Sequence, residues 1–201
     1  MPAFDPRQDY VLEDNRALLR PLLAGDAQLL GHFAEQEPEL WRYALSRVQH
    51  TADLERYIAD ALAGRAAGHA YPFAVYDKHA QAWAGSTRLY DLQPQHQSTQ
   101  LGYTWYGRDF QGTRLNKHCK YLLLSFAFGQ MGLERVEFRA DARNERSIRA
   151  MKALGCTVEG ILRSNCAAPS GRRDSIVLSI LRGEWEAELQ ERLRAQLDLI
   201  S

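Results

Sequence analysis

The run Gln111-Gly112-Thr113-Arg114-Leu115-Asn116 contains the residues best suited to bind an anion. It follows a short apolar run and leads into a sequence with helical hydrophobic spacing. The first turn of a helix leaves backbone N–H groups unpaired and carries partial positive charge, so phosphate oxygens suit it. Gly112 lets the backbone approach a ligand closely, and Thr113 adds a hydroxyl. We therefore expect a phosphate-binding turn at 111–116.

Positive charge gathers near this turn although the chain is neutral overall, with 25 Lys and Arg against 25 Asp and Glu. One acid, Asp109, stands among the basic residues Arg108, Arg114, Lys117, His118 and Lys120. Balanced overall charge argues against a protein held to nucleic acid by bulk electrostatics. The turn also lacks the GxxxxGK[ST] and GxGxxG patterns, which disfavours the P-loop and dinucleotide-binding classes.

Length and composition favour one globular domain over 1–201, because 201 residues with 45% hydrophobic content can build a substantial core. The sequence shows no apolar run typical of a signal peptide and none near the ~20 residues that span a bilayer. We therefore expect a cytoplasmic protein with no membrane partner. The three cysteines and six histidines lack metal-ligand spacing. We expect no metal, structural cysteines with Cys119 on a buried face, and a solvent-facing His118.

The elements that position the turn follow from periodicity and capping signals. Asp26 and Thr51 are placed to cap the helices that they begin. The expected helices span 26–34, 37–47, 51–62, 113 to about 129, 144–154 and 185–197. The expected strands span 15–23, 72–76, 83–90, 101–106, 135–140, 157–162 and 175–181. This order predicts a mixed α/β layer with one crossover unit whose helix begins at the phosphate-binding turn.

Four segments carry a resemblance to a known family. They are Leu101-Gly102-Tyr103-Thr104-Trp105, then Gln111-Gly112-Thr113 with Asn116, then Asp141 to Ser147, and Leu154-Gly155. Together they resemble the GNAT superfamily of acyl-CoA N-acyltransferases, in its RimJ/RimL-like branch, over roughly 18–185. The resemblance implies an α/β (α+β) fold with a mixed, mostly antiparallel central sheet, splayed after the fourth strand and flanked by helices. Acetyl-CoA would lie in the split.

The resemblance also implies which residues would bind the cosubstrate and act in the reaction. Backbone N–H groups of the turn would hold the pyrophosphate, and the strand before it would lie beside the thioester. The implied cofactor-binding residues are Thr104, Trp105, Tyr106, Gln111, Gly112, Thr113, Arg114, Leu115, Asn116, Asn144 and Ser147. The implied catalytic residues are Ser147, Tyr103 and Asn144. Asn144 and Ser147 also fit a plain helix cap with its third-position partner.

Four positions depart from the family pattern. Arg114 and Asn116 stand where small residues are usual, so they would either crowd the turn or, for Arg114, turn outward to pair with a phosphate. Met151 replaces the Tyr that often protonates the departing thiolate, which leaves Ser147, or Tyr103 and Tyr106 on the strand expected beside the thioester. Gln100 replaces a frequent Glu base, which leaves a water chain to Asp109, Glu145 or a histidine. A backbone N–H near 104–106 would stabilise the oxyanion.

The favoured function is an N-acetyltransferase that uses acetyl-CoA and a primary amine, either a small molecule or a protein N-terminus, by direct attack on the thioester. The alternatives are a CoA-binding protein with weak or lost catalysis and an unrelated phosphate- or nucleotide-binding module. A homodimer is an expectation from aromatic content and the last helix. Two sets of residues stay open between a site role and a structural one: Trp41, Tyr43 and Trp105 for the acceptor, and Arg143, Arg146, Arg149 and Lys152 for the CoA 3′-phosphate.

Overall fold

One mixed sheet organises the part of the chain that the structure describes, residues 4–197 of a computed structural model. Its strand order is β1-β2-β3-β4-β5-β6-β8-β7, and only the β5–β6 pair is parallel. The strands are β1 (Leu12–Glu13), β2 (Ala17–Pro21), β3 (Ala70–Asp77), β4 (Ala82–Gln93), β5 (Ser98–Tyr106), β6 (Arg135–Asp141), β7 (Thr157–Ala168) and β8 (Gly171–Leu181). The predicted mixed, mostly antiparallel sheet is confirmed.

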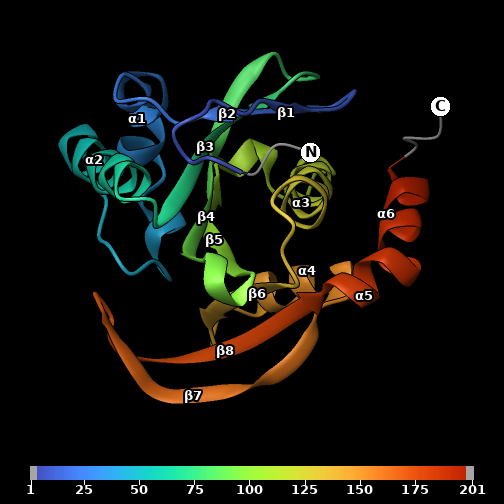
Figure 1. The fold of residues 1–201 in the computed structure, drawn as a ribbon. Helices are drawn as coiled ribbons and strands as arrows, with labels where there is room; N and C mark the ends of the chain where they lie inside the picture. Colours follow the sequence, from blue (N-terminus) through green and yellow to red (C-terminus); the bar gives the residue numbers. More distant parts are fainter. Residues whose placement is uncertain (1–3, 198–201) are drawn as a thin grey trace.

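Helices cover both faces of the first half of this sheet (Figure 1). On one face, α1 (Asp26–Gln36) and α2 (Thr51–Ala66) bury Leu54 and Ile58 together with Trp105 of β5. On the other face, α3 (Leu115–Ser125) buries Leu123 in a second core with Leu89 of β4. The remaining helical segments are η1 (Pro38–Trp41), η2 (Pro94–His96), η3 (Arg108–Phe110), η4 (Phe126–Gln130), α4 (Glu145–Leu154), α5 (Arg182–Glu184), η5 (Trp185–Leu189) and α6 (Gln190–Gln196).

The sheet splits between its two parallel strands. Strands β5 and β6 pair only where Ser98, Thr99 and Gln100 lie opposite Arg135, Val136 and Glu137. From Leu101 onward β5 stays paired with β4 alone. The crossover from β5 to β6 runs through α3, as the element order predicted. Because the fourth expected strand is β5, the splay lies at the predicted place.

The last two long strands form a curved hairpin that extends beneath the rest of the fold (Figure 1). Strand β8 continues the sheet beside β6, and β7 forms the outer edge. The hairpin reaches the region below α2 at its tip (Figure 1). Residues 169–170 at this tip line one groove together with the segment 38–49 between α1 and α2, and we call this groove the cleft.

Several local predictions need correction. The helix expected over 37–47 is a single turn, η1, which ends at Trp41. The N-caps of α1 and α2 are Gly25 and His50, not Asp26 and Thr51. Asp26 lies inside the first turn, where its carboxylate accepts a bond from the Leu23 N–H at 2.8 Å. Several residue types can cap a helix, so the path of the preceding loop decides which residue takes the N-cap position.

Candidate functional site

A backbone bulge marks β5 where it leaves β6. Ser86 of β4 pairs with Trp105, but Arg88 pairs with Gly102, so two β5 residues face one β4 residue. Tyr103, the first of the two, has φ of 49°. A non-glycine residue in the left-handed region is strained, and such strain gathers at functional sites. The bulge therefore reorients the β5 backbone at the point where it lines the split.

The side chains of the last β5 residues lie in the two cores. Trp105 packs against Phe33 and Trp41 on the α1 side, with ring centroids 5.9 and 4.9 Å away. Tyr106 belongs to the core on the α3 side and is 7% exposed. Burial raises the pKa of its hydroxyl, which has no hydrogen-bond partner. Trp105 and Tyr106 can therefore meet a ligand in the split only through their backbone.

A buried lysine joins α3 to β5. Lys120 Nζ donates to Thr104 Oγ1 at 2.8 Å, and that oxygen lies 2.7 Å from Thr87 Oγ1 of β4. Lys120 is 5% exposed, and burial lowers its pKa to about 8. Its place near the phosphate-binding turn in the sequence suggested an exposed charge. Lys120 stands three and four residues before the buried Leu123 and Leu124, so helical spacing places it on the buried face of α3.

His118 is also buried, so the prediction that it faces solvent is wrong. Its Nδ1 lies 2.7 Å from Asp14 Oδ2, and the two side chains are 5% and 7% exposed. The other carboxylate oxygen of Asp14 accepts the N–H groups of Arg16 and Ala17. The pair ties α3 to the turn between β1 and β2. This contact crosses 104 residues of sequence, so local spacing carries no sign of it.

The predicted phosphate-binding turn is open to solvent. Gly112, Thr113 and Arg114 are exposed, and nothing lies within 4 Å of a Cβ placed on Gly112, whose φ is 72°. Thr113 Oγ1 donates to the Phe110 carbonyl at 2.8 Å. The Leu115 side chain is buried in the core, and its backbone N–H donates to Thr113 Oγ1 at 3.3 Å. The turn therefore presents backbone N–H groups on an accessible surface.

Arg114 does not crowd the turn. Its guanidinium donates to the Gln196 carbonyl at the end of α6, and Lys117 Nζ donates to Gln196 Oε1 at 3.0 Å. Both side chains thus lie along α3 toward α6. Asn116 is half-buried in the first turn of α3. Arg114 thus turns outward, as one alternative expected, and its pairing with a phosphate stays a prediction.

A groove of about 350 Å³ lies between the turn and α4. Its lining residues are Glu39, Leu40, Arg108, Gln111 and Arg146. Arg146 of α4 donates to Gln111 Oε1 across the groove, while Gln111 Nε2 donates to the Tyr106 carbonyl at 2.8 Å. The groove thus connects the phosphate-binding turn with the start of α4.

At the start of α4, Asn144 and Ser147 form the predicted cap. Asn144 Oδ1 accepts the Ser147 N–H at 3.1 Å. Ser147 is half-buried, and Met151 one turn later is buried in the core. Two arginines of the predicted cluster have their own acids: Arg149 of α4 pairs with Glu145, and Arg143, which precedes α4, pairs with Asp141. Among the predicted cluster, Arg146 is the residue that faces the turn.

On the α2 side of β5, aromatic rings surround Arg88. Its guanidinium carbon lies 4.2 Å from the Tyr103 ring centroid and 5.1 Å from that of Tyr57. Tyr57 OH donates to the Tyr103 carbonyl at 3.2 Å, and burial raises the pKa of Tyr57 to about 12. Tyr90 meets the Tyr103 ring edge to face at 4.9 Å. The Tyr103 ring therefore belongs to the cleft beside α2.

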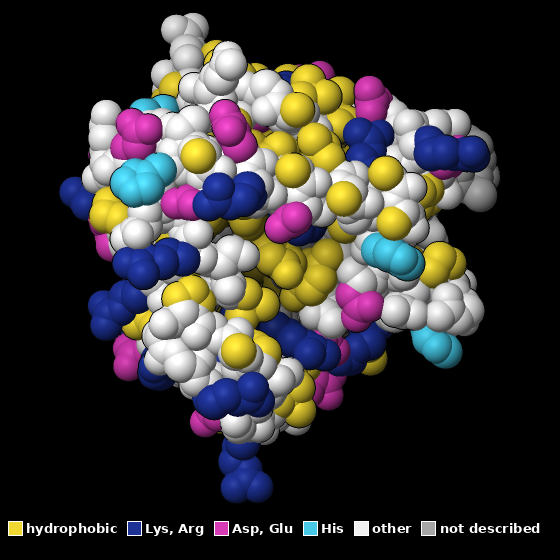
Figure 2. Space-filling model, turned by 90° about the vertical axis from the view of Figure 1, so that its left-hand side faces the viewer, with side chains coloured by type: hydrophobic (Ala, Val, Ile, Leu, Met, Phe, Trp, Pro, Cys, Tyr) yellow, Lys and Arg dark blue, Asp and Glu magenta, His cyan; other side chains and the backbone are white. Residues whose placement is uncertain are grey.

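A second groove of about 350 Å³ opens between the segment after η1 and the tip of the β7–β8 hairpin. Its lining residues are Pro38, Trp41, Arg42, Arg47, Val48, Gln49, Pro169 and Ser170. Figure 2, which views the molecule from this side, shows a hollow with a hydrophobic floor and Lys or Arg side chains along its lower edge. Trp41 lies both in the core with Trp105 and at this groove.

Residues 16–157, well over half of the chain, match the family described as the acetyltransferase (GNAT) domain. The chain belongs to the GNAT acetyltransferases. YdaF of Bacillus subtilis (strain 168), provisionally named a ribosomal N-acetyltransferase, is 28% identical over 104 residues, or 52% of this chain and 56% of that protein. The chain thus spans about half the length of that relative.

Solved structures share the complete fold. A provisionally named acetyltransferase from T. thermophilus has 32% sequence identity and a TM-score of 0.84, over 98% of this chain and 100% of that one. The ribosomal-protein-S5-alanine acetyltransferase of Vibrio fischeri has 19% identity and a TM-score of 0.72, over 88% of this chain and 99% of that one. At such identity, the second likeness speaks for the fold alone.

GNAT membership implies acetyl-CoA as the cosubstrate, and the described residues fit it. The split beside β5, the exposed backbone of the turn and the groove toward α4 adjoin one another. Burial raises the pKa of the Cys119 and Cys156 thiols to about 12, which leaves them unreactive. Within residues 4–197 no group of three or more His, Cys, Asp or Glu side chains could hold a metal ion. Among those same residues, no helix is long and apolar enough to cross a membrane.

Proposed function

We propose that this GNAT domain transfers an acetyl group from acetyl-CoA to a primary amine. The single observation that supports it most is the loss of pairing between β5 and β6 beyond Gln100, beside a strained bulge at Tyr103. An unpaired strand edge offers backbone groups to a ligand. The exposed turn at 111–116 lies at the end of the same strand, so one extended molecule could contact both.

The residues divide between binding and chemistry. Backbone N–H groups at 112–116 would hold the pyrophosphate at the N-terminus of α3, with Arg146 on the opposite side of the groove. Asn144 and Ser147 would contact the pantetheine from α4, and the backbone of Thr104, Trp105 and Tyr106 would line the split. When bound, acetyl-CoA would supply an activated acyl thioester.

Proton transfer needs other groups in this chain, because Gln100 and Met151 stand where the family often has its base and its acid. A primary amine attacks only when neutral, yet Gln100 is no base and donates to Asp91 Oδ2 at 2.8 Å. Ser147 is the proposed donor to the leaving thiolate, because the Tyr103 ring packs on Arg88 and Met151 is apolar. Lys120 of α3, which donates to Thr104 of β5, adds a second proton carrier with a pKa of about 8.

The proposed acceptor is the one expected from the sequence: a small amine or a protein N-terminus. The name of YdaF favours the second. The alternative, a CoA-binding protein with weak or lost catalysis, rests on Gln100 and Met151. A cytoplasmic location and a homodimer are further parts of the proposal.

The first test is calorimetric titration of acetyl-CoA and CoA into the wild type and Asn116→Asp. The substitution places a carboxylate in the first turn of α3, where negative charge favours the helix itself. A loss of binding would therefore reflect repulsion of phosphate. We expect the Kd to rise about tenfold or more, as repulsion of more than about 1.4 kcal/mol would produce.

Asn15→Asp is the matched control, because Asn15 is exposed in the turn before β2. It should leave the Kd unchanged. Turnover with a panel of amines at saturating acetyl-CoA then separates an active enzyme from a binding protein. Absence of binding to the wild type would overturn the proposal.

A further inference from the structure

Two guanidinium groups are buried on β4 and β8, the strands next to β5 and β6, and neither forms a salt bridge within residues 4–197. Arg88 of β4 is 8% exposed and Arg173 of β8 is 7% exposed. Among the salt bridges of residues 4–197, none includes Arg88 or Arg173. A buried charge without an opposite charge is costly. We call Arg88 and Arg173 the arginine pair.

The surroundings of Arg88 hold it in place and leave its edge available. The rings of Tyr57 and Tyr103 contact the guanidinium through cation–π geometry. Such contacts use the face of the group, whereas a carboxylate binds the N–H donors in its plane. Arg88 also lies opposite Gly102, directly before the bulge on β5. An anion bound to Arg88 would therefore lie close to the split.

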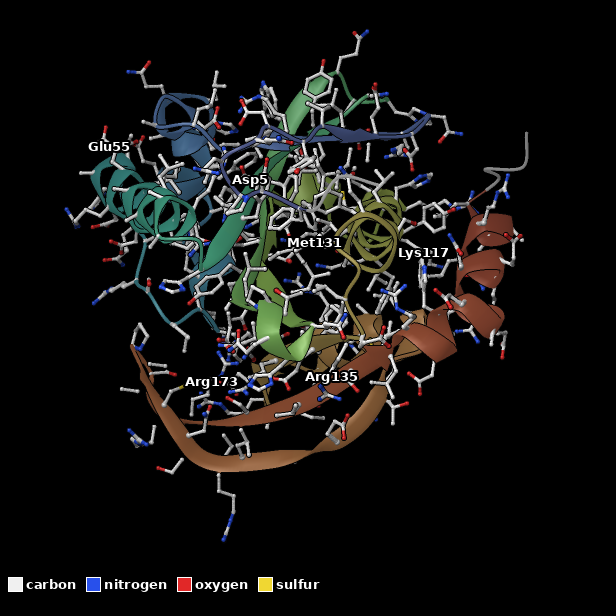
Figure 3. All side chains as sticks on the ribbon, in the orientation of Figure 1. Asp5, Glu55, Lys117, Met131, Arg135 and Arg173 are labelled. Atoms are coloured by element: carbon white, nitrogen blue, oxygen red, sulfur yellow. The ribbon has the colours of Figure 1, made fainter. Side chains whose placement is uncertain are left out.

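Arg173 has a polar but uncharged neighbourhood. Its Nε donates to Ser175 Oγ at 3.0 Å, and that hydroxyl donates to Asn165 Oδ1 at 2.6 Å. Tyr90, which packs on Tyr103, has a pKa that burial raises and that the charges of Arg139 and Arg173 lower, so Arg173 acts on the same side of the fold as Tyr103. Figure 3 shows Arg173 above the β7–β8 hairpin, on the side that faces the rest of the fold.

The carboxylates near the arginine pair are already occupied. Both oxygens of Asp141 accept bonds from Arg143, at 2.9 and 2.7 Å. Glu137 accepts bonds from Arg139 at 2.7 Å and Arg135 at 3.2 Å. The charge of Arg173 also lowers the pKa of Asp141, after the larger effect of Arg143, but the carboxylate hydrogen bonds go to Arg143.

The residues at the mouth of the cleft are also basic. Arg42 and Arg47 line the second groove, and neither belongs to a salt bridge within residues 4–197. Among the described residues, the buried indole N–H of Trp41 beside this groove has no hydrogen-bond partner. The groove thus carries positive charge at its rim.

We propose that the amine acceptor carries a carboxylate, which the arginine pair binds while the amine faces the split between β5 and β6. This inference rests on the proposed acetyltransferase function and names its substrate class. Two sources supply such a group: the α-carboxylate of a free amino acid, or an acidic side chain near a peptide N-terminus.

The test compares kcat/KM for two matched pairs of acceptors, with the acetylated product measured by mass spectrometry. One pair is alanine and alaninamide, and the other is a C-terminally amidated peptide that begins Ser-Asp or Ser-Asn. We expect at least a tenfold preference for the carboxylate in one pair, in line with charge-assisted hydrogen bonds of about twice ordinary strength. The pair that shows the preference identifies the source.

Arg88→Met and Arg173→Met should each reduce that preference to about threefold or less. Arg65→Met is the matched control, because Arg65 also lies over a tyrosine ring, 4.6 Å from Tyr71, but pairs with Asp9 far from the cleft. Its preference ratio should equal that of the wild type. Equal kcat/KM for carboxylate and amide in both pairs would overturn the inference.

A binding measurement separates this inference from the proposed function. N-acetylalanine and the N-acetylated Ser-Asp peptide are titrated into the CoA-saturated wild type, alongside their amide counterparts. If no amine is turned over but the carboxylate products bind at least tenfold more tightly than the amides, the transfer function fails and the carboxylate site stands. If acetyl-CoA binds and the carboxylate products bind no better than the amides, the carboxylate site is wrong.

Discussion

The basic residues near the phosphate-binding turn differ sharply from those beside the bulge on β5. Arg108 and Arg146 are exposed and hold the neighbouring side chains of Glu39 and Gln111. Lys120, Arg88 and Arg173 are at most 8% exposed and form no salt bridge within residues 4–197. The first group can exchange partners for a ligand at little cost, since water screens it. Burying the charges of the second group costs desolvation free energy. The chain keeps these charges despite that cost, so they are the stronger sign of function.

Removing the charge of Lys120 should give the largest effect on stability. Burial lowers the pKa of Lys120 from 10.5 to about 8. Below pH 8 the folded protein keeps this proton, and the buried charge then lowers the free energy of unfolding by about 3 kcal/mol. The unfolded chain binds this proton up to pH 10.5, so stability should rise between about pH 8 and 10.5. Lys120→Met should lack this rise and be more stable than the wild type near pH 7.

Urea unfolding of both proteins from pH 7 to 10 measures this difference, with Lys152→Met, an exposed α4 position, as the control. The control should follow the wild-type curve. Parallel curves for the wild type and Lys120→Met would show that the buried charge carries no penalty. Slower acetyl transfer in the stabilised variant would link the penalty to activity.

Charge reversal at Arg146 should give a smaller effect, which weakens CoA binding and leaves the stability unchanged. Arg146→Glu places an acid beside the phosphate-binding turn, so we expect CoA affinity to fall about tenfold with unchanged stability. Arg149→Glu, on the same helix but paired with Glu145, is the control and should bind CoA as the wild type does. Calorimetric titration measures both. Equal losses would mean that α4 acts through its general charge rather than through the Gln111 contact.

The Arg108–Glu39 ion pair should give the smallest effect. The two side chains are 68% and 49% exposed, and exposed pairs contribute about 0–1 kcal/mol. Arg108→Ala should change the free energy of unfolding by less than about 0.5 kcal/mol, measured by urea titration with a Glu39→Ala double-mutant cycle. A coupling energy above about 1.5 kcal/mol would erase the distinction between exposed and buried basic residues.

The sequence predicted those parts of the site that depend on neighbouring residues. The cap from Asn144 to Ser147 spans three positions, and the spacing alone identifies it. The turn at 111–116 and the helix after it were likewise predicted, although α3 begins at Leu115 rather than Thr113. The two wrong caps, Asp26 and Thr51, show the limit, because the path of the preceding loop chooses the capping residue.

The order and periodicity of the elements, read together with the family resemblance, predicted a splayed mixed sheet with an anion site at the start of its crossover helix. Such signals arise from the 3.6- and 2-residue repeats and from caps within a few residues, so a single segment contains them. Only the tertiary structure decided which charges are buried. His118 meets Asp14 across 104 residues, Lys120 meets Thr104 of a strand, and Arg88 meets Tyr57 of a distant helix. The cost of burying a charge depends on what surrounds it in space, and no local pattern records those surroundings.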